Sequence, residues 1–92
     1  MSSPEPILEF VFTAHALKEM TRRNIAEQEV QDVLAKPEQM EIVRDGRAVY
    51  QNKYIFTKTS KTYILRVFVD IDIKPPHVVT VYRTSKIEKY WR

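Results

Sequence analysis

The stretch YILRVFVDI, residues 63–71, decides the fold. Successive side chains of a β-strand point to opposite faces. One face therefore carries Tyr63, Leu65, Val67, Val69 and Ile71, and the other carries Ile64, Arg66, Phe68 and Asp70. An apolar period of two predicts a strand that is buried on at least one face. Other elements must therefore pack on it.

Neighbouring stretches repeat this period and predict a mainly antiparallel sheet. Residues 40–44 and 47–56 flank Asp45-Gly46, a pair that accepts the positive φ of a hairpin turn. A polar turn at 58–61 leads into residues 63–71, and a last strand is expected over 78–83. Residues 7–12 are rich in β-formers and predict a short edge strand.

Two helices are expected before the sheet. Thr13 can cap the first helix, in which Ala16, Leu17 and Met20 would form the buried stripe, and Asn24 suits its end. The second helix is expected over 27–36. Its inner face would consist of Val30, Val33 and Leu34, and Pro37 would stop it. A turn this short predicts an αα-hairpin.

A third helix is expected at the C-terminus. Ser85 and Glu88 match a capping box, and Ile87, Tyr90 and Trp91 would share one side that docks on the sheet. The predicted fold class is α+β: a helical hairpin packed on a four- or five-stranded, mainly antiparallel sheet with a short C-terminal helix. Residues 1–6 would be a flexible tail, and residues 7–92 a single domain.

Composition excludes several classes of function. The 92 residues contain no cysteine, so a disulfide scaffold, a thiolate zinc site and a cysteine nucleophile are excluded. Two histidines make a histidine metal cluster improbable, and no glycine-rich phosphate loop occurs. No apolar run is long enough to span a membrane, and no signal peptide pattern is present. We expect a cytoplasmic protein that needs no metal or other cofactor.

Charge is segregated along the chain. Residues 1–45 carry five basic and nine acidic side chains, a net −4, whereas residues 46–92 carry ten basic and three acidic ones, a net +7. A surface of one sign concentrates a partner of the opposite sign. The basic half therefore suits a polyanion, RNA above all, although a solvated sheet face with ordinary lysines would give the same count.

The last thirteen residues carry the densest candidate site. This segment, 80–92, interleaves four cations with three aromatic residues. Arginine and lysine bind phosphate, and aromatic rings stack on unpaired bases. Tyr82, Arg83 and Lys86 suit this function best, because Tyr90 and Trp91 have the spacing of core residues and Lys89 that of a solvated one.

Other candidates each have two interpretations. Arg66 either pairs with Asp70 or Glu88, or projects into a cleft toward phosphate. His15 either moves protons near neutral pH or bonds a neighbouring carbonyl. Arg22 and Arg23 either complement the helix dipole or bind phosphate.

Motifs across the chain resemble a family of small prokaryotic proteins described as a domain of unknown function, placed with the RelE/ParE/BrnT-like toxins. The resemblance rests on Phe12-Thr13-x-His15-Ala16 with Met20, on Arg23-x-Ile25 with Val30 and Pro37, on Val79-Thr80-Val81-Tyr82, and on Lys86-Ile87-x-Lys89-Tyr90-Trp91. It implies a helical hairpin beside an antiparallel sheet. RelE-like and BrnT-like toxins cut RNA, often on the ribosome, whereas ParE-like ones act on gyrase.

The expectation that follows is a metal-independent endoribonuclease toxin of a type II toxin–antitoxin pair. Arg66 and Arg83 would stabilise the negative charge that develops on the phosphorane, and Lys86 would share either this role or proton transfer. His15 or Tyr82 would be the acid or base. Further RNA contacts are expected from Arg22, Arg23, Lys53, Lys61, Lys89 and Tyr90. This requires Arg66, Arg83 and Lys86 to converge on one solvent-reachable hollow.

The expected partners are RNA or the ribosome and a small acidic antitoxin. Two alternatives remain open: a non-enzymatic module that binds nucleic acid or inhibits gyrase, and a non-toxic protein whose apolar groove accepts a peptide.

Overall fold

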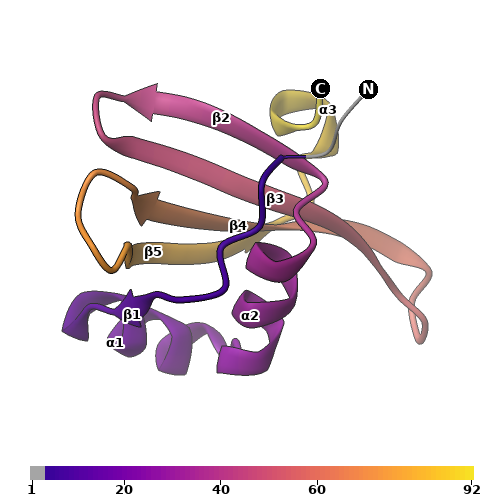
Figure 1. Ribbon diagram of the computed structural model, residues 1–92. Coiled ribbons are helices and arrows are strands. Elements are labelled where there is room, and N and C mark those ends of the chain that lie inside the picture. Colours follow the sequence, from indigo (N-terminus) through magenta and orange to yellow (C-terminus); the bar gives the residue numbers. More distant parts are fainter. Residues whose placement is uncertain (1–3) are drawn as a thin grey trace.

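The computed structural model describes residues 4–92 and shows a helical hairpin on one side of a five-stranded sheet (Figure 1). The elements are β1 (Val11–Phe12), α1 (Ala14–Arg23), α2 (Glu27–Ala35), β2 (Gln39–Arg44), β3 (Arg47–Phe56), β4 (Lys61–Asp70), β5 (His77–Thr84) and α3 (Ile87–Tyr90). The predicted α+β class is confirmed. Of the expected tail, residues 1–3 lie outside the described residues.

The strand order β1-β5-β4-β3-β2 places the decisive strand β4 in the middle of the sheet. β3 and β4 pair antiparallel over ten positions, from Arg47 opposite Asp70 to Phe56 opposite Lys61. The β2–β3 hairpin turns at Gly46, whose φ is +76° as the sequence predicted for this position. β1 pairs parallel with β5 and contains only two residues, fewer than the six expected, so the sheet is mixed.

The helical hairpin covers one face of the sheet. The core joins α1 and α2 to alternate residues of β3, β4 and β5, and its fully buried members are Ala16, Val30, Val33, Leu34, Ala48, Leu65, Val67, Val69, Val78 and Val81. We call this side of the sheet the helix face. The opposite side carries Gln51, Lys53, Arg66, Phe68 and Tyr82, and because α3 lies on it we call it the α3 face.

α1 confirms its predicted caps but not its whole predicted stripe. Thr13 Oγ1 accepts a hydrogen bond from the Ala16 amide at 3.1 Å, and Asn24 adopts the left-handed conformation. Ala16 and Met20 are buried, whereas Leu17 is 40% exposed. The prediction for Leu17 is wrong because α1 packs over β5 near the edge of the sheet, where only a narrow stripe of the helix is covered.

α2 begins and ends close to its predicted positions and buries the predicted residues. The Glu29 carboxylate accepts a hydrogen bond at 2.8 Å from the amide of Ala26, the N-cap residue, which has no capping side chain of its own. A capping box has two hydrogen bonds, and here only the one from the N-cap amide to the Glu29 carboxylate is formed.

α3 begins later than predicted. Its N-cap is Lys86, with no side-chain cap, so the capping box expected between Ser85 and Glu88 is wrong. The hydroxyl of Thr84 instead accepts a hydrogen bond from the Lys86 amide at 3.1 Å, and the Ser85 carbonyl accepts one from the Ile87 amide. A tight turn therefore occupies the position of the expected cap.

None of the helices within residues 4–92 has the length and apolar character needed to cross a membrane.

Truncation of Leu34 tests the core. We expect Leu34→Ala to lower the free energy of unfolding by about 2–5 kcal/mol, because a fully buried leucine leaves a cavity between α2 and the sheet. Urea denaturation followed by circular dichroism measures this loss. The matched change Leu17→Ala should cost less than about 1 kcal/mol. Equal losses at the two positions would contradict the packing described above.

Candidate functional site

Arg66 lies at the centre of the α3 face, on the middle strand, with 7% of its surface exposed. Its Nε donates a hydrogen bond to Gln51 Oε1 at 3.0 Å, and one terminal nitrogen donates to the Tyr82 hydroxyl at 2.6 Å. The register explains both contacts, because Gln51 and Tyr82 are the cross-strand neighbours of Arg66 on β3 and β5.

Aromatic rings enclose this buried cation. Its guanidinium carbon lies 4.1 Å from the ring centroid of Tyr90, 5.3 Å from that of Phe68 and 5.7 Å from that of Tyr82. The electron-rich faces of such rings attract a cation. Among the described residues no carboxylate pairs with Arg66, because the expected partner Asp70 binds Arg47 instead, at 2.6 Å. The cluster of Arg66, Gln51, Phe68, Tyr82 and Tyr90 is named the Arg66 cluster.

Two glutamines hold the C-terminal segment on this cluster. Gln51 Nε2 donates to the Tyr90 carbonyl at 2.9 Å and to Gln39 Oε1 at 2.8 Å. Gln39 in turn binds both the carbonyl and the amide of Arg92. These bonds fix α3 so that the Tyr90 ring covers Arg66. Tyr90 thus docks α3 on the sheet as predicted, but Tyr90 and Trp91 are only half-buried and do not belong to the core.

The pKa values of the two tyrosines in the cluster are shifted in opposite directions. Burial raises the pKa of Tyr82 above its ordinary value of 10.0, although its hydrogen bond with Arg66 opposes the shift. Hydrogen bonding with Tyr82 lowers the pKa of Tyr90 below 10.0, and the charges of Lys89 and Arg66 lower it further. Neighbouring groups whose environments separate their pKa values suit an acid and base pair. Tyr90 is the better base and Tyr82 the better acid.

Exposed cations surround the cluster. Lys53 Nζ lies 4.4 Å from the ring centroid of Trp91, and Lys89 Nζ lies 5.3 Å from that of Tyr90. Lys86 is exposed at the N-cap of α3. The structure thus brings together Arg66, Tyr82, Tyr90, Lys53 and Lys89, with Lys86 at the adjoining turn.

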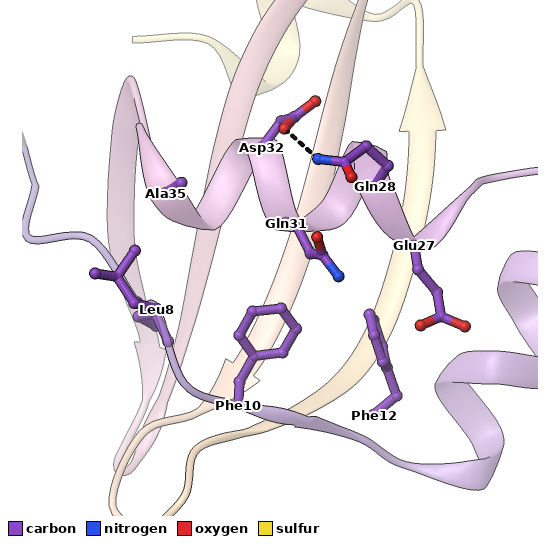
Figure 2. Close-up of a pocket in the computed structure, with 9 residues that line it drawn as sticks. Leu8, Phe10, Phe12, Glu27, Gln28, Gln31, Asp32 and Ala35 are labelled. Carbon is purple, nitrogen blue, oxygen red and sulfur yellow. Dashed lines mark hydrogen bonds between the residues drawn. The ribbon is translucent and has the colours of Figure 1, made fainter.

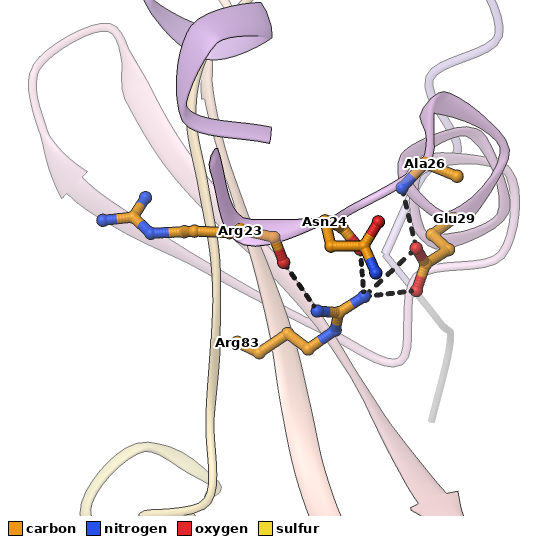
Figure 3. A network of polar contacts seen from close by, with 5 residues as sticks. All are labelled: Arg23, Asn24, Ala26, Glu29 and Arg83. Atoms are coloured by element: carbon orange, nitrogen blue, oxygen red, sulfur yellow. Dashed lines mark hydrogen bonds and ion pairs between the residues drawn. The ribbon is translucent and has the colours of Figure 1, made fainter. Parts of the chain in front are cut away.

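Arg83 does not join this group. It follows Tyr82 along β5, so its side chain leaves the sheet on the helix face, opposite Leu65. There its guanidinium donates to the carbonyls of Arg23 and Asn24 at 3.0 Å and pairs with Glu29 at 3.2 Å (Figure 3). The expected convergence of Arg66, Arg83 and Lys86 is therefore wrong, because strand alternation separates the two arginines. Arg83 fastens the turn between α1 and α2 to β5.

The remaining predicted site residues lie elsewhere. His15 is exposed on α1, in the layer that covers the helix face, and Arg22 pairs with Glu19 at the end of the same helix. Arg23 donates to the Val81 carbonyl at 2.9 Å and pairs with Glu19. Lys61 is exposed at the far end of the β3–β4 hairpin. None of them contacts the Arg66 cluster.

Gln51 and Phe68 belong to the site but were not among the residues predicted for it. Gln51 directly follows the apolar run Ala48-Val49-Tyr50 of a predicted strand, and a polar side chain that is buried there needs a hydrogen-bond partner. Only the register reveals that this partner is Arg66.

A hollow of about 580 Å³ lies on the other side of the molecule, between the N-terminal segment and α2 (Figure 2). Phe10 and Phe12 point toward α2, whereas Leu8 is mostly exposed at one end of the hollow, and the polar wall carries Glu27 and Asp32. Its lining contains no lysine or arginine, so it does not suit a polyanion. Within residues 4–92 no group of three or more acidic or histidine side chains could hold a metal ion.

Comparison with known proteins gives one match. The model of a protein family described as "Domain of unknown function (DUF4258)" matches residues 12–83, most of the chain. No curated protein and no solved structure matches.

Replacing Arg83 tests its structural role. We expect Arg83→Met to lower the free energy of unfolding by about 1–3 kcal/mol, because two backbone carbonyls and the Glu29 carboxylate lose their donor. The control Arg22→Met, in an exposed ion pair, should change it by less than about 0.5 kcal/mol. Urea denaturation distinguishes the two. Equal stability of both variants would remove the role assigned to Arg83.

Proposed function

The chain belongs to the DUF4258 family, and we propose that it is a toxin-type, metal-independent endoribonuclease that acts on RNA at its α3 face. The observation that carries this proposal is the Arg66 cluster, in which a buried guanidinium contacts two tyrosines whose pKa values are shifted apart.

RNA binding is supported by the surroundings of the cluster. Lys53, Lys86 and Lys89 are exposed and offer point charges for phosphates. Trp91 and Tyr90 are half-buried, so parts of their rings remain available to stack on unpaired bases. A sheet face with rings and cations suits single-stranded RNA better than a duplex, whose bases are not free to stack.

Cleavage without a metal needs a base, an acid and positive charge. The Tyr90 phenolate would accept the proton of a ribose 2′-hydroxyl, whose oxygen then bonds to the adjacent phosphorus. The phosphorus–5′-oxygen bond breaks as Tyr82 donates its proton to the leaving oxygen. The products are a 2′,3′-cyclic phosphate and a free 5′-hydroxyl.

Arg66 would act mainly through the tyrosines. With 7% of its surface exposed it offers little direct contact to a phosphate, whereas its bond to the Tyr82 hydroxyl at 2.6 Å orients the acid. Its charge also favours the Tyr90 phenolate. We therefore assign Arg66 as a positioning residue and the exposed lysines as the groups that meet the phosphate.

Membership of the RelE/ParE/BrnT-like superfamily is part of the proposal. It is supported by the element order, in which a helical hairpin precedes an antiparallel four-strand meander and a C-terminal helix lies on the sheet. A small acidic antitoxin would bind and neutralise the same face, because the exposed cations Lys53, Lys86 and Lys89 surround the Arg66 cluster.

A second candidate function is RNA binding without cleavage. Two observations favour it: the Tyr90 ring covers Arg66, and His15 lies in the layer on the other face of the sheet. The catalytic set would then consist of two phenols, which are poor proton carriers at neutral pH.

Two separate assays test the proposal: purified protein mixed with single-stranded RNA in EDTA, and purified protein mixed with translating ribosomes in a buffer that contains Mg²⁺. We expect cleavage with 2′,3′-cyclic phosphate ends, and no cleavage of RNA whose 2′-hydroxyls are methylated. Tyr82→Phe should lower the rate about a hundredfold or more with RNA binding kept. Lys53→Gln should weaken binding and reduce its salt dependence, whereas Arg22→Gln, a matched loss of charge elsewhere, should do neither.

Binding without cleavage in both settings would favour the second candidate. Absence of salt-dependent RNA binding would refute both functions.

The pH profile tests the assignment of acid and base. Because the pKa of Tyr90 is lowered from 10.0 and that of Tyr82 is raised, the cleavage rate should rise with pH as the Tyr90 phenolate forms. It should fall only at higher pH, where Tyr82 loses its proton, after subtraction of alkaline RNA hydrolysis. Tyr90→Phe should remove the rising limb. An unchanged limb in that variant would assign the base to another residue.

A further inference from the structure

The outer end of the β3–β4 hairpin carries aromatic rings that do not belong to the Arg66 cluster. β5 stops at Thr84 opposite Ile64, so β3 and β4 continue past it and project beyond the two helices (Figure 1). Tyr54 and Tyr63 lie opposite each other on the two strands, with ring centroids 5.7 Å apart, and the Phe56 ring lies 5.3 Å from that of Tyr63. Phe56 is 51% exposed, so its ring is open to solvent.

A hollow of about 190 Å³ lies beside these rings, where the chain leaves β5, and we call it the Phe56 hollow. Its volume is below the roughly 300–1,000 Å³ of pockets that enclose a whole small molecule, so it suits a single ring system. Phe56 and Tyr63 supply apolar ring surface, and the hydroxyls of Thr59, Thr62 and Ser85 also line it. Hydroxyls both donate and accept hydrogen bonds, so they can meet the polar edge of any nucleobase.

The charges around the Phe56 hollow favour a nucleotide over an uncharged ring. Residues 53–69 contain four cations and no acidic side chain, and the lining of the hollow contains Lys61 and Arg83 but no carboxylate. Arg83 is already paired with Glu29, so the exposed Lys58 and Lys61 are the groups left for an anion. A base with its neighbouring phosphates would use both the rings and these lysines. An aromatic side chain of a protein would leave the lysines without a partner.

The Phe56 hollow adjoins the α3 face at the turn after β5. Ser85, which lines the hollow, also lines a neighbouring hollow together with Lys86 and Lys89. Lys89 in turn lies beside Tyr90 of the Arg66 cluster. A bound strand could therefore pass from the Phe56 hollow over Lys86 to the Arg66 cluster without crossing the helical hairpin.

We propose that the Phe56 hollow is a base-binding subsite, in which one unpaired base of a single-stranded RNA stacks on Phe56. Lys58 and Lys61 contact the phosphates beside that base. This inference rests on the proposed function, because its ligand is the RNA strand that the α3 face binds. The subsite gives the strand a second point of attachment, away from the Arg66 cluster. Every base has a face that can stack, so the subsite should tolerate any sequence.

Fluorescence anisotropy with a single-stranded RNA of about ten nucleotides, within the usual size range of such sites, tests the proposal. The 2′-hydroxyls are methylated so that binding is measured without cleavage. We expect Phe56→Ala to raise the Kd at least about fivefold, the loss typical of one stacked base. Lys61→Gln should reduce the salt dependence of binding. Circular dichroism checks that each variant stays folded.

Ile55→Ala is the matched control. Ile55 is 67% exposed and precedes Phe56 on the same strand, so its side chain leaves the sheet on the other face and should not affect the Kd. An RNA of the same length with abasic sugars is the control on the ligand. It keeps the phosphates but has no rings, so Phe56→Ala should leave its binding unchanged.

The outcomes separate this inference from the proposed function. An unchanged Kd in Phe56→Ala, with binding still dependent on Lys53, would overturn the subsite and leave the function of the α3 face intact. Equal losses in Phe56→Ala and Ile55→Ala would also overturn it. Absence of salt-dependent RNA binding by the wild-type protein would overturn both. Amide NMR shifts at Tyr63 and Thr84 with a tryptophan-containing peptide, and none with RNA, would assign the hollow to a protein partner instead.

Discussion

Side-chain alternation along β4 and β5 is the constraint on which the rest of the structure depends. The apolar set of β4 faces the helical hairpin, so Arg66 and Phe68 must leave the sheet on the other side. The same rule sends Tyr82 toward Arg66 and its neighbour Arg83 toward the hairpin. One face therefore carries the hydrophobic core and the other carries the ionisable cluster. A shift of one residue in either strand would exchange the two sets.

The groups that replace water around Arg66 explain why this cluster is the candidate site. A buried charge is costly unless other polar groups replace its water, and the usual replacement is a carboxylate. Here a glutamine carbonyl, a tyrosine hydroxyl and three ring faces take that place. This arrangement leaves the cation without a neutralising partner among the described residues. Its positive potential can therefore act on a phenol or on a bound anion, which is why we place the function at this face.

Much of the fold could be predicted because its signals are local. Thr13, Asn24 and Asp45-Gly46 mark helix and hairpin boundaries through their own conformational preferences, and the structure confirms each. The predictions for Leu17 and Ser85 failed because they depend on how much of α1 the sheet covers and on how the last strand turns. The site was harder to predict, since joining Arg66 to Tyr82, Gln51 and Tyr90 requires the pairing register and the path of the C-terminal segment. Sequence alone places Arg66 and Arg83 on neighbouring strands, but it does not show that their side chains point to opposite faces of the sheet.

The reciprocal contacts of Arg23 and Arg83 have a consequence for how the chain folds. Arg23 binds the Val81 carbonyl and Arg83 binds the Arg23 carbonyl, across about 60 residues of intervening chain. The two helices can form early from local interactions, whereas this junction must await the last strand of the sheet. The turn between α1 and α2 should thus gain protection from amide exchange only at the end of folding. In the native protein, that turn and β5 should open together as one cooperative unit.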